Sequence, residues 1–336
     1  MATAKKKKRK SQAPVALVYF VTVIIFIALL AVLAIYLLKQ FNIIGQKKDG
    51  EEAVTTPVFT DLFARVNSKG ILSDMAVIRI SPEEQTILVI PISAVTKSAK
   101  EPDKTMRDIF AETGMPGVKS AVQDTFDIAL DNYATLTNDA FERVADVFGG
   151  ITYTAPEELY YLSQDNDEND ISIVKGDLVN LNGRQIRLLT QYPVFSNGRQ
   201  GNNDFLGLAL ENLLNNAFQQ ANITLDNLDN IYSIITSNSD TDITTENYKL
   251  MKSYLKQMLS AGLTPATSMC PQGTWSEDGN TFEVSAEFKM QLSELVSKDE
   301  AEAAAADSAV QTAQAAPAIT QEAPITEAPA ETQAAE

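Results

Sequence analysis

A continuous apolar stretch without charge, Val15 to Leu38, is the first pattern in the chain. At about 1.5 Å per residue its 24 residues would span roughly 36 Å as a helix, enough to cross a hydrocarbon core of about 30 Å. The basic run Lys5 to Lys10 precedes it and is expected to stay cytoplasmic. A cleavable signal peptide, with an apolar region of about 7–15 residues, is the competing interpretation. The length favours a cytoplasmic tail at 1–13 and an uncleaved transmembrane anchor at 14–38.

Strand-like alternation begins further along the chain. Residues 75–80 and 86–90 are rich in Val, Ile and Leu and flank the turn 81–85, which is typical of a hairpin. Shorter strands are expected at 133–136 and 151–154. These segments supply the strands of the predicted fold.

Apolar residues recur at helical spacing in four segments: 118–130, 138–148, 204–219 and 244–260. The second of these is expected to begin at a cap, Asn138 or Asp139, and to stop at Gly149-Gly150. The third is expected to begin at Asp204, an N-cap residue type. Helices of this length interleaved with strands predict an α/β fold with a central mixed β-sheet flanked by helices.

The segments on either side of this pattern lack large apolar side chains. Residues 39–56 read as a polar linker. Residues 299–336 are dominated by Ala, Glu, Thr, Gln and Pro, a composition that cannot bury enough surface to offset its conformational entropy. The sequence therefore predicts one domain at 57–298, outside the cell, followed by a disordered tail.

Charge and composition exclude several functions. No acidic residue precedes Leu38, so the portion after it has a formal charge of 21 − 44 = −23. Nucleic acid is not an expected partner, because its binding relies on Lys and Arg against phosphates. The chain has no histidine and one cysteine, Cys270, which excludes a Ser-His-Asp triad, an internal disulfide and zinc ligation by His and Cys together.

Taken in order, a set of short motifs resembles the LytR-CpsA-Psr family of Gram-positive envelope proteins. The motifs are Ser73-Asp74, Ile90-Pro91, Asp131-Asn-Tyr133, Phe141, Asp146, Phe148-Gly-Gly-Ile151, Gly176, Leu181-Asn-Gly183, Asn203-Asp-Phe205 and Thr241-Asp-Ile-Thr244. The resemblance covers roughly residues 57 to 290 and implies an α/β/α fold. It also implies transfer of a phosphoglycosyl polymer from a polyprenyl pyrophosphate to peptidoglycan, with arginines and Mg²⁺ on the diphosphate and an apolar pocket for the lipid.

The arginines that the resemblance implies are missing from their positions. The family's Ile-Pro-Arg-Asp segment reads Ile90-Pro-Ile-Ser93, and its Arg-x-Arg strand falls on Gln191-Tyr-Pro193. Further arginine and glutamine positions fall on Gly207, Leu210 and Glu211. Three or four lost phosphate contacts at about 1.5–3 kcal/mol each would cost several powers of ten in rate. Pro193 would also remove a backbone donor from the expected site strand.

Several residues remain as candidates. Asp74 is either a Mg²⁺ ligand or a carboxylate at the start of a strand, and replacement cations are sought among Arg107, Arg184, Arg187 and Arg199. Arg199 is the best placed, in a loop before the matching helix. Three weaker features are each expected to have a structural role: Trp275 as a packed residue rather than a sugar platform, residues 165–170 as a solvated loop rather than a calcium site, and Cys270 as a small buried side chain.

Three functions stay open from sequence. The first is a membrane-anchored, non-catalytic or weakly active protein that binds a polyprenyl pyrophosphate, a glycopolymer, peptidoglycan or an active paralogue. The second is a divergent Mg²⁺-dependent transferase, which predicts that Arg107, Arg187 or Arg199 converge on Asp74 in a pocket. The third is a structural protein of the wall, which predicts that large side chains have collapsed the pocket.

Overall fold

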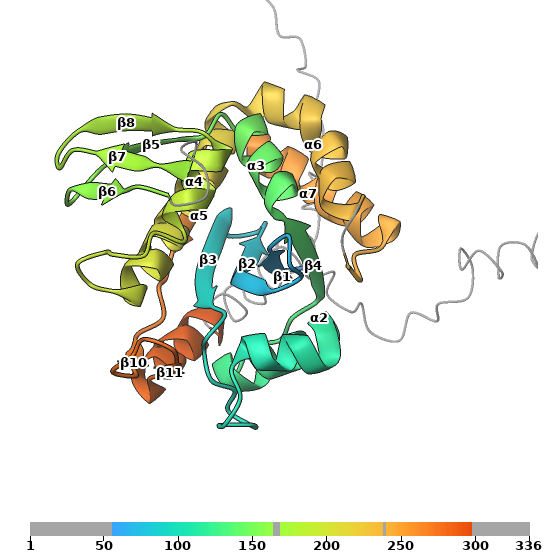
Figure 1. The fold of residues 1–336 in the computed structure, drawn as a ribbon. Coiled ribbons are helices and arrows are strands. Elements are labelled where there is room, and N and C mark those ends of the chain that lie inside the picture. The colour runs from blue at the N-terminus through green and yellow to red at the C-terminus, as the bar shows by residue number, and fades with distance from the viewer. Residues whose placement is uncertain (1–55, 164–168, 238–239, 298–336) are drawn as a thin grey trace, which may run out of the picture. The chain divides into compact units, whose positions relative to one another are not determined.

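The computed structural model describes residues 56–163, 169–237 and 240–297 (Figure 1). The predicted cytoplasmic tail, anchor, C-terminal tail and nearly all of the linker lie outside these ranges. Most of the 165–170 loop does so as well. Within these ranges, no helix has the length and apolar character needed to cross a membrane.

A five-stranded mixed sheet forms the centre of the domain, as predicted (Figure 1). Its strands, in spatial order, are β4 (Asn132–Thr137), β1 (Phe59–Val66), β2 (Leu72–Ser81), β3 (Thr86–Ser93) and β9 (Ala266–Ser268). The three central strands pair antiparallel, and β4 and β9 add in parallel at the two edges. The predicted hairpin, strand 133–136 and strand 151–154 are confirmed, and β1 was not predicted as a strand.

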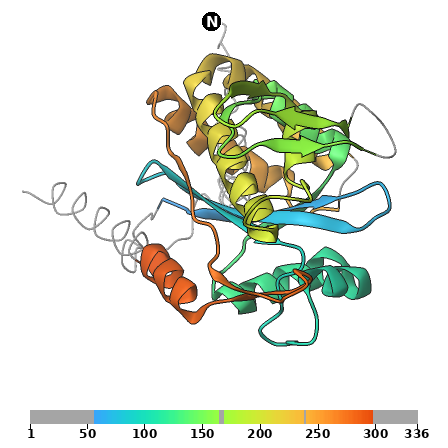
Figure 2. The same ribbon diagram turned by 60° about the vertical axis from the view of Figure 1, so that its left-hand side comes forward.

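Helices cover both faces of the sheet, which gives three α/β/α layers (Figures 1 and 2). One face carries α2 (Met106–Phe126) and a helix from residue 286 that is described as far as 297. The opposite face carries α3 (Asn138–Val147), α5 (Arg199–Gln219), α6 (Ala221–Thr236) and α7 (Thr245–Ser260). Because both faces are covered, β3 is buried along nearly its whole length and reads as a continuous apolar run.

A smaller layer of two antiparallel strand pairs packs beside α3 and α5 (Figure 1). The outer pair is β5 (Ile151–Thr154) with β8 (Leu178–Leu181), and the chain between them forms the hairpin of β6 (Leu159–Tyr161) with β7 (Ile171–Ile173). The short helix α4 (Gly183–Leu189) follows β8. A separate hairpin, β10 (Gly273–Trp275) with β11 (Phe282–Val284), lies beside the segment before α2, where Phe282 bridges Thr96.

Several helix boundaries differ from the prediction. The helix α2 ends at Phe126, where Asp127 adopts a left-handed conformation, so residues 129 and 130 fall outside it. Thr137 caps α3 in place of the expected Asn138 or Asp139, because its Oγ1 accepts a hydrogen bond from the Ala140 N–H. The helix α5 begins at Arg199, so Asp204 lies inside it and is not its N-cap. The prediction that Asp204 is the N-cap is wrong because the polar residues 199–203 before it are also helical.

A tight turn fixes the entry to β5. Gly150 has φ of +69°, and a Cβ built on it would lie 2.2 Å from the Leu181 carbonyl oxygen. Gly183 is equally restricted, because its Cβ would meet the Glu142 carbonyl at 2.2 Å, and its N–H donates to Asp146 Oδ1 at 2.7 Å. The glycines of both motifs therefore hold the small hairpin layer against α3.

The segment 240–242 covers the outer edge of β4. Thr241 bridges Ala134 antiparallel, and Asp242 accepts hydrogen bonds from the Tyr133 N–H and the Lys119 ammonium, at 2.5 and 2.9 Å. The Tyr133 N–H, which would otherwise face solvent at this edge, is satisfied in this way, and the Tyr133 carbonyl accepts from the Asp242 N–H. The Thr241-Asp242 motif thus has a structural role at the sheet edge.

Asp61 is a buried carboxylate in β1, only 2% exposed. Burial raises its pKa, two hydrogen bonds from Asn132 lower it, and the charges of Asp131 and Asp242 raise it further. A raised folded pKa contributes stability that is present below the unfolded pKa and lost as pH rises through the folded pKa. We expect Asp61→Asn to raise Tm at pH 7, since the amide resembles the neutral acid and keeps an acceptor for Asn132.

Thermal unfolding at neutral and acidic pH checks this prediction. The gain in Tm should shrink as pH falls through the raised folded pKa and disappear below the ordinary carboxyl pKa, where the wild-type acid is neutral in both states. Asp103→Asn, at an exposed position, is the control. A lower Tm for Asp61→Asn at pH 7 would show that the charged form is stabilised instead.

Candidate functional site

Two hollows adjoin at the end of β2 where Asp74 lies, and Asp74 and Leu206 line both of them. The first is a polar pocket of about 220 Å³. Its wall includes the side chains of Asp74, Ser93, Arg107, Thr190, Arg199 and Asn203. Asn203 is buried and donates to the Pro91 carbonyl at 3.2 Å, which fixes α5 to the end of β3. The pocket is therefore built on rigid elements.

Two of the predicted arginines line this polar pocket. Arg107 stands in the first turn of α2, and its Nε donates to the Leu72 carbonyl oxygen at 3.0 Å. Burial lowers the pKa of Arg107, and the positive charge of Arg199 lowers it further. Among the described residues, the side chain of Arg199 has no hydrogen-bond or ion-pair partner. Two guanidinium groups thus share a pocket with donors left for an anion.

A third arginine, Arg65 in β1, lies directly behind Asp74. Its Nε donates to Asp74 Oδ1 at 3.1 Å, and its Nη2 forms an ion pair with Oδ2. Its remaining donors reach Asn138 Oδ1 at 2.9 Å and Thr190 Oγ1 at 2.7 Å. Side-chain exposure is 3% for Arg65 and 14% for Asp74, so this is a buried ion pair. Arg65 is not among the candidates predicted from the sequence, although alternate residues of β1 place it on the same face as Asp61 and Phe63.

The other two arginine candidates lie outside the polar pocket. Arg187 is in the last turn of α4 and forms an ion pair with Glu142 of α3. Arg184 donates to Asn169 Oδ1 at 3.2 Å. Arg187 therefore lies outside the polar pocket, and its side chain holds α4 to α3.

Other side chains and close contacts fill the positions where the family's arginines are expected. Ile92 is fully buried, and a Cβ on Gly207 would lie 2.9 Å from Cys270 Sγ and 3.0 Å from Pro91 Cγ. Glu211 accepts hydrogen bonds from the N–H and hydroxyl of Ser268, both at 2.8 Å. At these positions a long cation has no room or would displace a hydrogen bond.

The segment 191–193 does not form the expected strand. It is a turn after α4, in which the N–H groups of Gln191 and Tyr192 donate to the carbonyls of Leu188 and Leu189. The prediction that Pro193 breaks a strand is wrong for this reason. Gln191 nevertheless lines the polar pocket.

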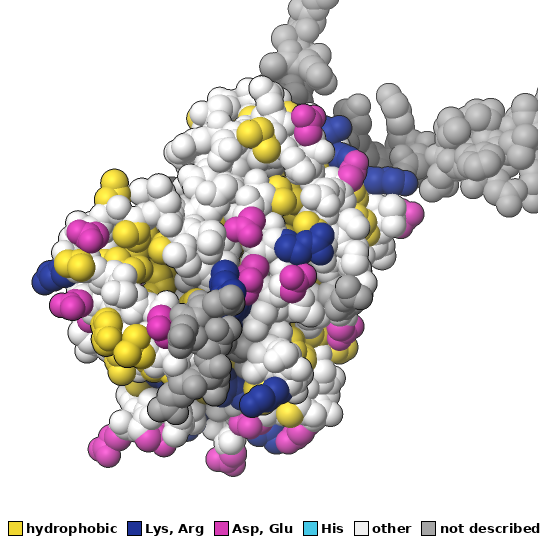
Figure 3. All heavy atoms as spheres, turned by 45° about the horizontal axis from the view of Figure 1, so that its top comes forward, with side chains coloured by type: hydrophobic (Ala, Val, Ile, Leu, Met, Phe, Trp, Pro, Cys, Tyr) yellow, Lys and Arg dark blue, Asp and Glu magenta, His cyan; other side chains and the backbone are white. Residues whose placement is uncertain are grey.

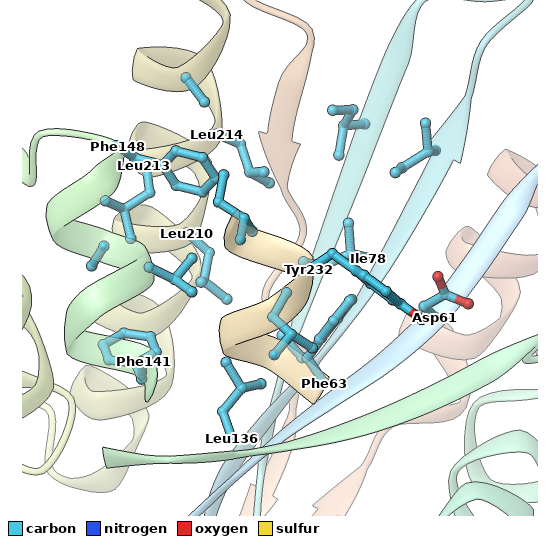
Figure 4. Close-up of a pocket in the computed structure, with 18 of the residues that line it drawn as sticks. Asp61, Phe63, Ile78, Leu136, Phe141, Phe148, Leu210, Leu213, Leu214 and Tyr232 are labelled. Atoms are coloured by element: carbon cyan, nitrogen blue, oxygen red, sulfur yellow. The ribbon is translucent and has the colours of Figure 1, made fainter. Parts of the chain in front are cut away.

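The second hollow is an apolar cavity of about 250 Å³ between the sheet and α3, α5, α6 and α7 (Figure 4). Side chains from each layer point into it, including Phe63, Ile78, Leu136, Phe141, Phe148, Leu210, Leu213, Leu214 and Tyr232. It follows β2 from Asp74 to Ile80, a rise of about 20 Å at roughly 3.3 Å per residue. Large side chains have not closed it, which contradicts the prediction of the wall-structure hypothesis.

Charges on the molecular surface are mixed. On the described part of the face in Figure 3, Lys and Arg side chains lie among Asp and Glu side chains and do not gather in one basic patch. The arginines of the polar pocket are therefore a local feature of an acidic protein.

Trp275 packs within its own domain, as expected. Its ring lies 4.7 Å from that of Phe282, and its Nε1 donates to Gln200 Oε1 at 2.9 Å. Gln200 in turn donates to Asp204 Oδ1 at 2.7 Å. This chain of contacts fixes the first turns of α5, which carry Arg199.

Cys270 is partly buried, and burial raises its pKa to about 12, with Asp204 and Glu211 adding negative charge. At pH 8 the thiolate fraction is then roughly 10⁻⁴. We expect iodoacetamide to react with the folded chain about 10³-fold more slowly than with the unfolded chain, whose thiol has a pKa of about 8.5. Alkylation followed by mass spectrometry, with and without denaturant, measures the ratio. Rates within about tenfold of each other would contradict an inert buried thiol.

Fold and site together define a three-layer α/β/α protein in which an apolar cavity adjoins an arginine-lined pocket. A family model described as the LytR_cpsA_psr family matches residues 87–296. The chain therefore belongs to the LytR-CpsA-Psr family, which confirms the resemblance drawn from the motifs.

Solved structures share this fold. A protein from Eubacterium siraeum DSM 15702 has a TM-score of 0.63 at 15% identity, over 76% of this chain and 98% of its own. TagV from B. subtilis has a TM-score of 0.57 at 20% identity, over 73% and 97%. TagT bound to LIIa-WTA has a TM-score of 0.57 at 12% identity, over 76% and 95%. No curated protein matches the chain by sequence.

Proposed function

We propose that this chain is a non-catalytic or weakly active LytR-CpsA-Psr protein that binds a polyprenyl-linked phosphate at the cell envelope. The observation that supports the proposal is that the apolar cavity and the polar pocket adjoin at Asp74, which lines both. The apolar cavity suits the lipid chain, and the pocket lined by Arg107 and Arg199 suits the phosphates. A related fold, that of TagT, has been solved with LIIa-WTA bound.

Loss of efficient transfer is inferred from what the polar pocket lacks. Ile92 is buried where the family has arginine, and Gly207 is packed against Pro91 and Cys270. Catalysis of phosphoryl transfer depends on fixed charges that neutralise the transition state. Arg107 and Arg199 supply two such charges, which is enough to hold an anion but fewer than the motif set implies.

The cellular placement belongs to the same proposal. Residues 14–38 are proposed to anchor the chain, with 1–13 cytoplasmic and the domain at 57–298 extracellular, in a bacterium of the Gram-positive type. The domain would then lie on the same side of the membrane as externally displayed lipid-linked precursors. Peptidoglycan, a glycopolymer or an active paralogue remain candidate partners for the exposed surface.

A second function, divergent phosphotransfer, has one observation in its favour. Arg107, Arg199 and Asp74 line one pocket, as the transferase hypothesis predicted for two of its three arginines. In that case they would replace the lost arginines.

Binding and turnover measured together separate the two functions. The full chain is purified in detergent and mixed with a polyprenyl pyrophosphate, with and without Mg²⁺, and bound lipid and released phosphate are quantified. Binding without release supports the proposal. Mg²⁺-dependent release that is abolished in Asp74→Asn, while that variant remains folded by thermal unfolding, would establish the transferase. Absence of binding under both conditions would refute both functions.

A further inference from the structure

The carboxylate that the family resemblance assigns to Mg²⁺ already has a cation beside it. Both oxygens of Asp74 accept hydrogen bonds from Arg65, one from Nε at 3.1 Å and the other from Nη2. These bonds use about two of the four lone-pair positions of the carboxylate, and the guanidinium charge beside it neutralises Asp74 and repels a second cation. The residues present therefore do not fit a Mg²⁺ site.

Carboxylates that could complete a metal site are also missing. Among the described residues, no group of three or more His, Cys, Asp and Glu side chains is placed to hold an ion. Of the described residues that line the polar pocket, Asp74 alone is acidic. Mg²⁺ prefers oxygen ligands and carboxylates, and a single neutralised carboxylate is a poor start for it.

Arg65 is held so that it cannot leave Asp74 easily. Asn138 and Thr190 accept its other donors, and its guanidinium lies over the Phe141 ring at 5.5 Å. All three nitrogens of the Arg65 guanidinium therefore donate hydrogen bonds. Residues of β1, the start of α3 and the end of α4 hold the group in this orientation. A guanidinium fixed in this way presents a permanent positive charge behind the pocket.

We propose that Arg65 acts as a built-in counter-cation that replaces the divalent metal at Asp74, so that phosphate binding in this pocket is independent of metal. Three arginines, Arg65, Arg107 and Arg199, then stand against one carboxylate, a formal charge of 3 − 1 = +2. This excess favours an anion without any added ion. The inference rests on the proposed function for the nature of the ligand, but its metal independence is tested separately.

The test measures binding of a polyprenyl monophosphate to the full chain in EDTA and in millimolar Mg²⁺. A monophosphate is the probe because it chelates Mg²⁺ less than a pyrophosphate does. Wild-type affinity should agree within about twofold between the buffers. In Arg65→Ala, the uncovered carboxylate should repel the phosphate and weaken binding by about tenfold or more in EDTA. Mg²⁺ should restore part of this binding, because the oxygens of the bound phosphate supply the ligands that the protein lacks. Wild-type binding that falls by about tenfold in EDTA would overturn the inference.

Matched variants separate this role from a purely structural one. Arg187→Ala removes an arginine from another partly buried ion pair, with Glu142, outside the polar pocket, and should show no response to Mg²⁺. Arg65→Lys keeps the charge and loses the fork, so it should bind in EDTA with intermediate affinity and serves if Arg65→Ala does not fold. An Arg65 variant that is folded, weakened and indifferent to Mg²⁺ would contradict the counter-cation role.

Failure of the proposed function would be recognisable. If wild type binds no lipid phosphate in either buffer, the proposed ligand is wrong. The inference is then decided by thermal unfolding with Mg²⁺ and no lipid, because an ion that binds the folded state raises Tm. Mg²⁺ should leave the Tm of wild type unchanged. A rise in wild type would overturn the inference independently.

Discussion

Replacing Arg107 and Arg199 together by alanine is expected to abolish most binding of a polyprenyl pyrophosphate. Each charge-assisted contact to phosphate contributes about 1.5–3 kcal/mol, so the loss is roughly 3–6 kcal/mol, or about two to four powers of ten in affinity. Titration of the full chain with the lipid in detergent measures this. The expected loss is large because the phosphates would keep their charge in a pocket without open cations.

The two single variants should differ in their effect on folding. The side chain of Arg199 has no hydrogen-bond or ion-pair partner among the described residues, so Arg199→Ala should weaken binding and leave Tm unchanged. Arg107 is half-buried and donates to the Leu72 carbonyl, so Arg107→Ala should also lower Tm. This difference distinguishes loss of ligand contacts from loss of structure.

A matched control uses two arginines outside the polar pocket. Arg143 is exposed, with Asp139 3.9 Å away, and Arg187 is paired with Glu142. Their double replacement by alanine removes the same formal charge from the domain. Equal losses of affinity in the two double variants would show that net charge, and not the polar pocket, controls binding.

The layered fold followed from hydrophobic periodicity because the buried strands are nearly all apolar. The runs at 75–80 and 86–90 in β2 and β3 are too apolar for an exposed segment, so a buried strand is the structure they predict. The helix α6 was missed because residues 221–236 are rich in Asn, Asp and Thr, which have low helix propensity. Packing of Leu228, Ile231 and Ile234 overrides this preference.

The site was less accessible to sequence reasoning than the fold. Asp74, Arg107 and Arg199 come from β2, α2 and α5, and only the tertiary structure brings them to one pocket. Arg65 was missed because β1 was not predicted as a strand, so nothing placed its side chain toward Asp74. The sequence could not show that Glu142 of a neighbouring helix lies within reach of Arg187 and pairs with it. The motifs indicated where the polar pocket lies, but they did not indicate which arginines line it.

Asp74→Ala is expected to destabilise the domain strongly. Removing one partner of a buried ion pair leaves the other charge unpaired and typically costs about 3–5 kcal/mol. For a domain of this size that corresponds to a fall in Tm of roughly 6–20 °C. Arg65, 3% exposed and held by Asn138 and Thr190, cannot turn to solvent. Thermal unfolding measures the effect, and Asp229→Ala, at an exposed carboxylate paired with Lys252, is the control that should change little.

Removing both charges tests whether the pair itself stabilises the fold. The double variant Arg65→Met with Asp74→Leu should recover most of the lost Tm, because apolar replacements of similar size avoid the desolvation cost of a buried pair. The same variant should bind lipid phosphate more weakly than wild type if the two residues shape the polar pocket. Recovered stability with weakened binding would mean that this ion pair is kept for the ligand and not for the fold. If Asp74→Ala instead leaves Tm unchanged, Arg65 finds another partner when Asp74 is absent, and the fixed pair inferred here does not exist in solution.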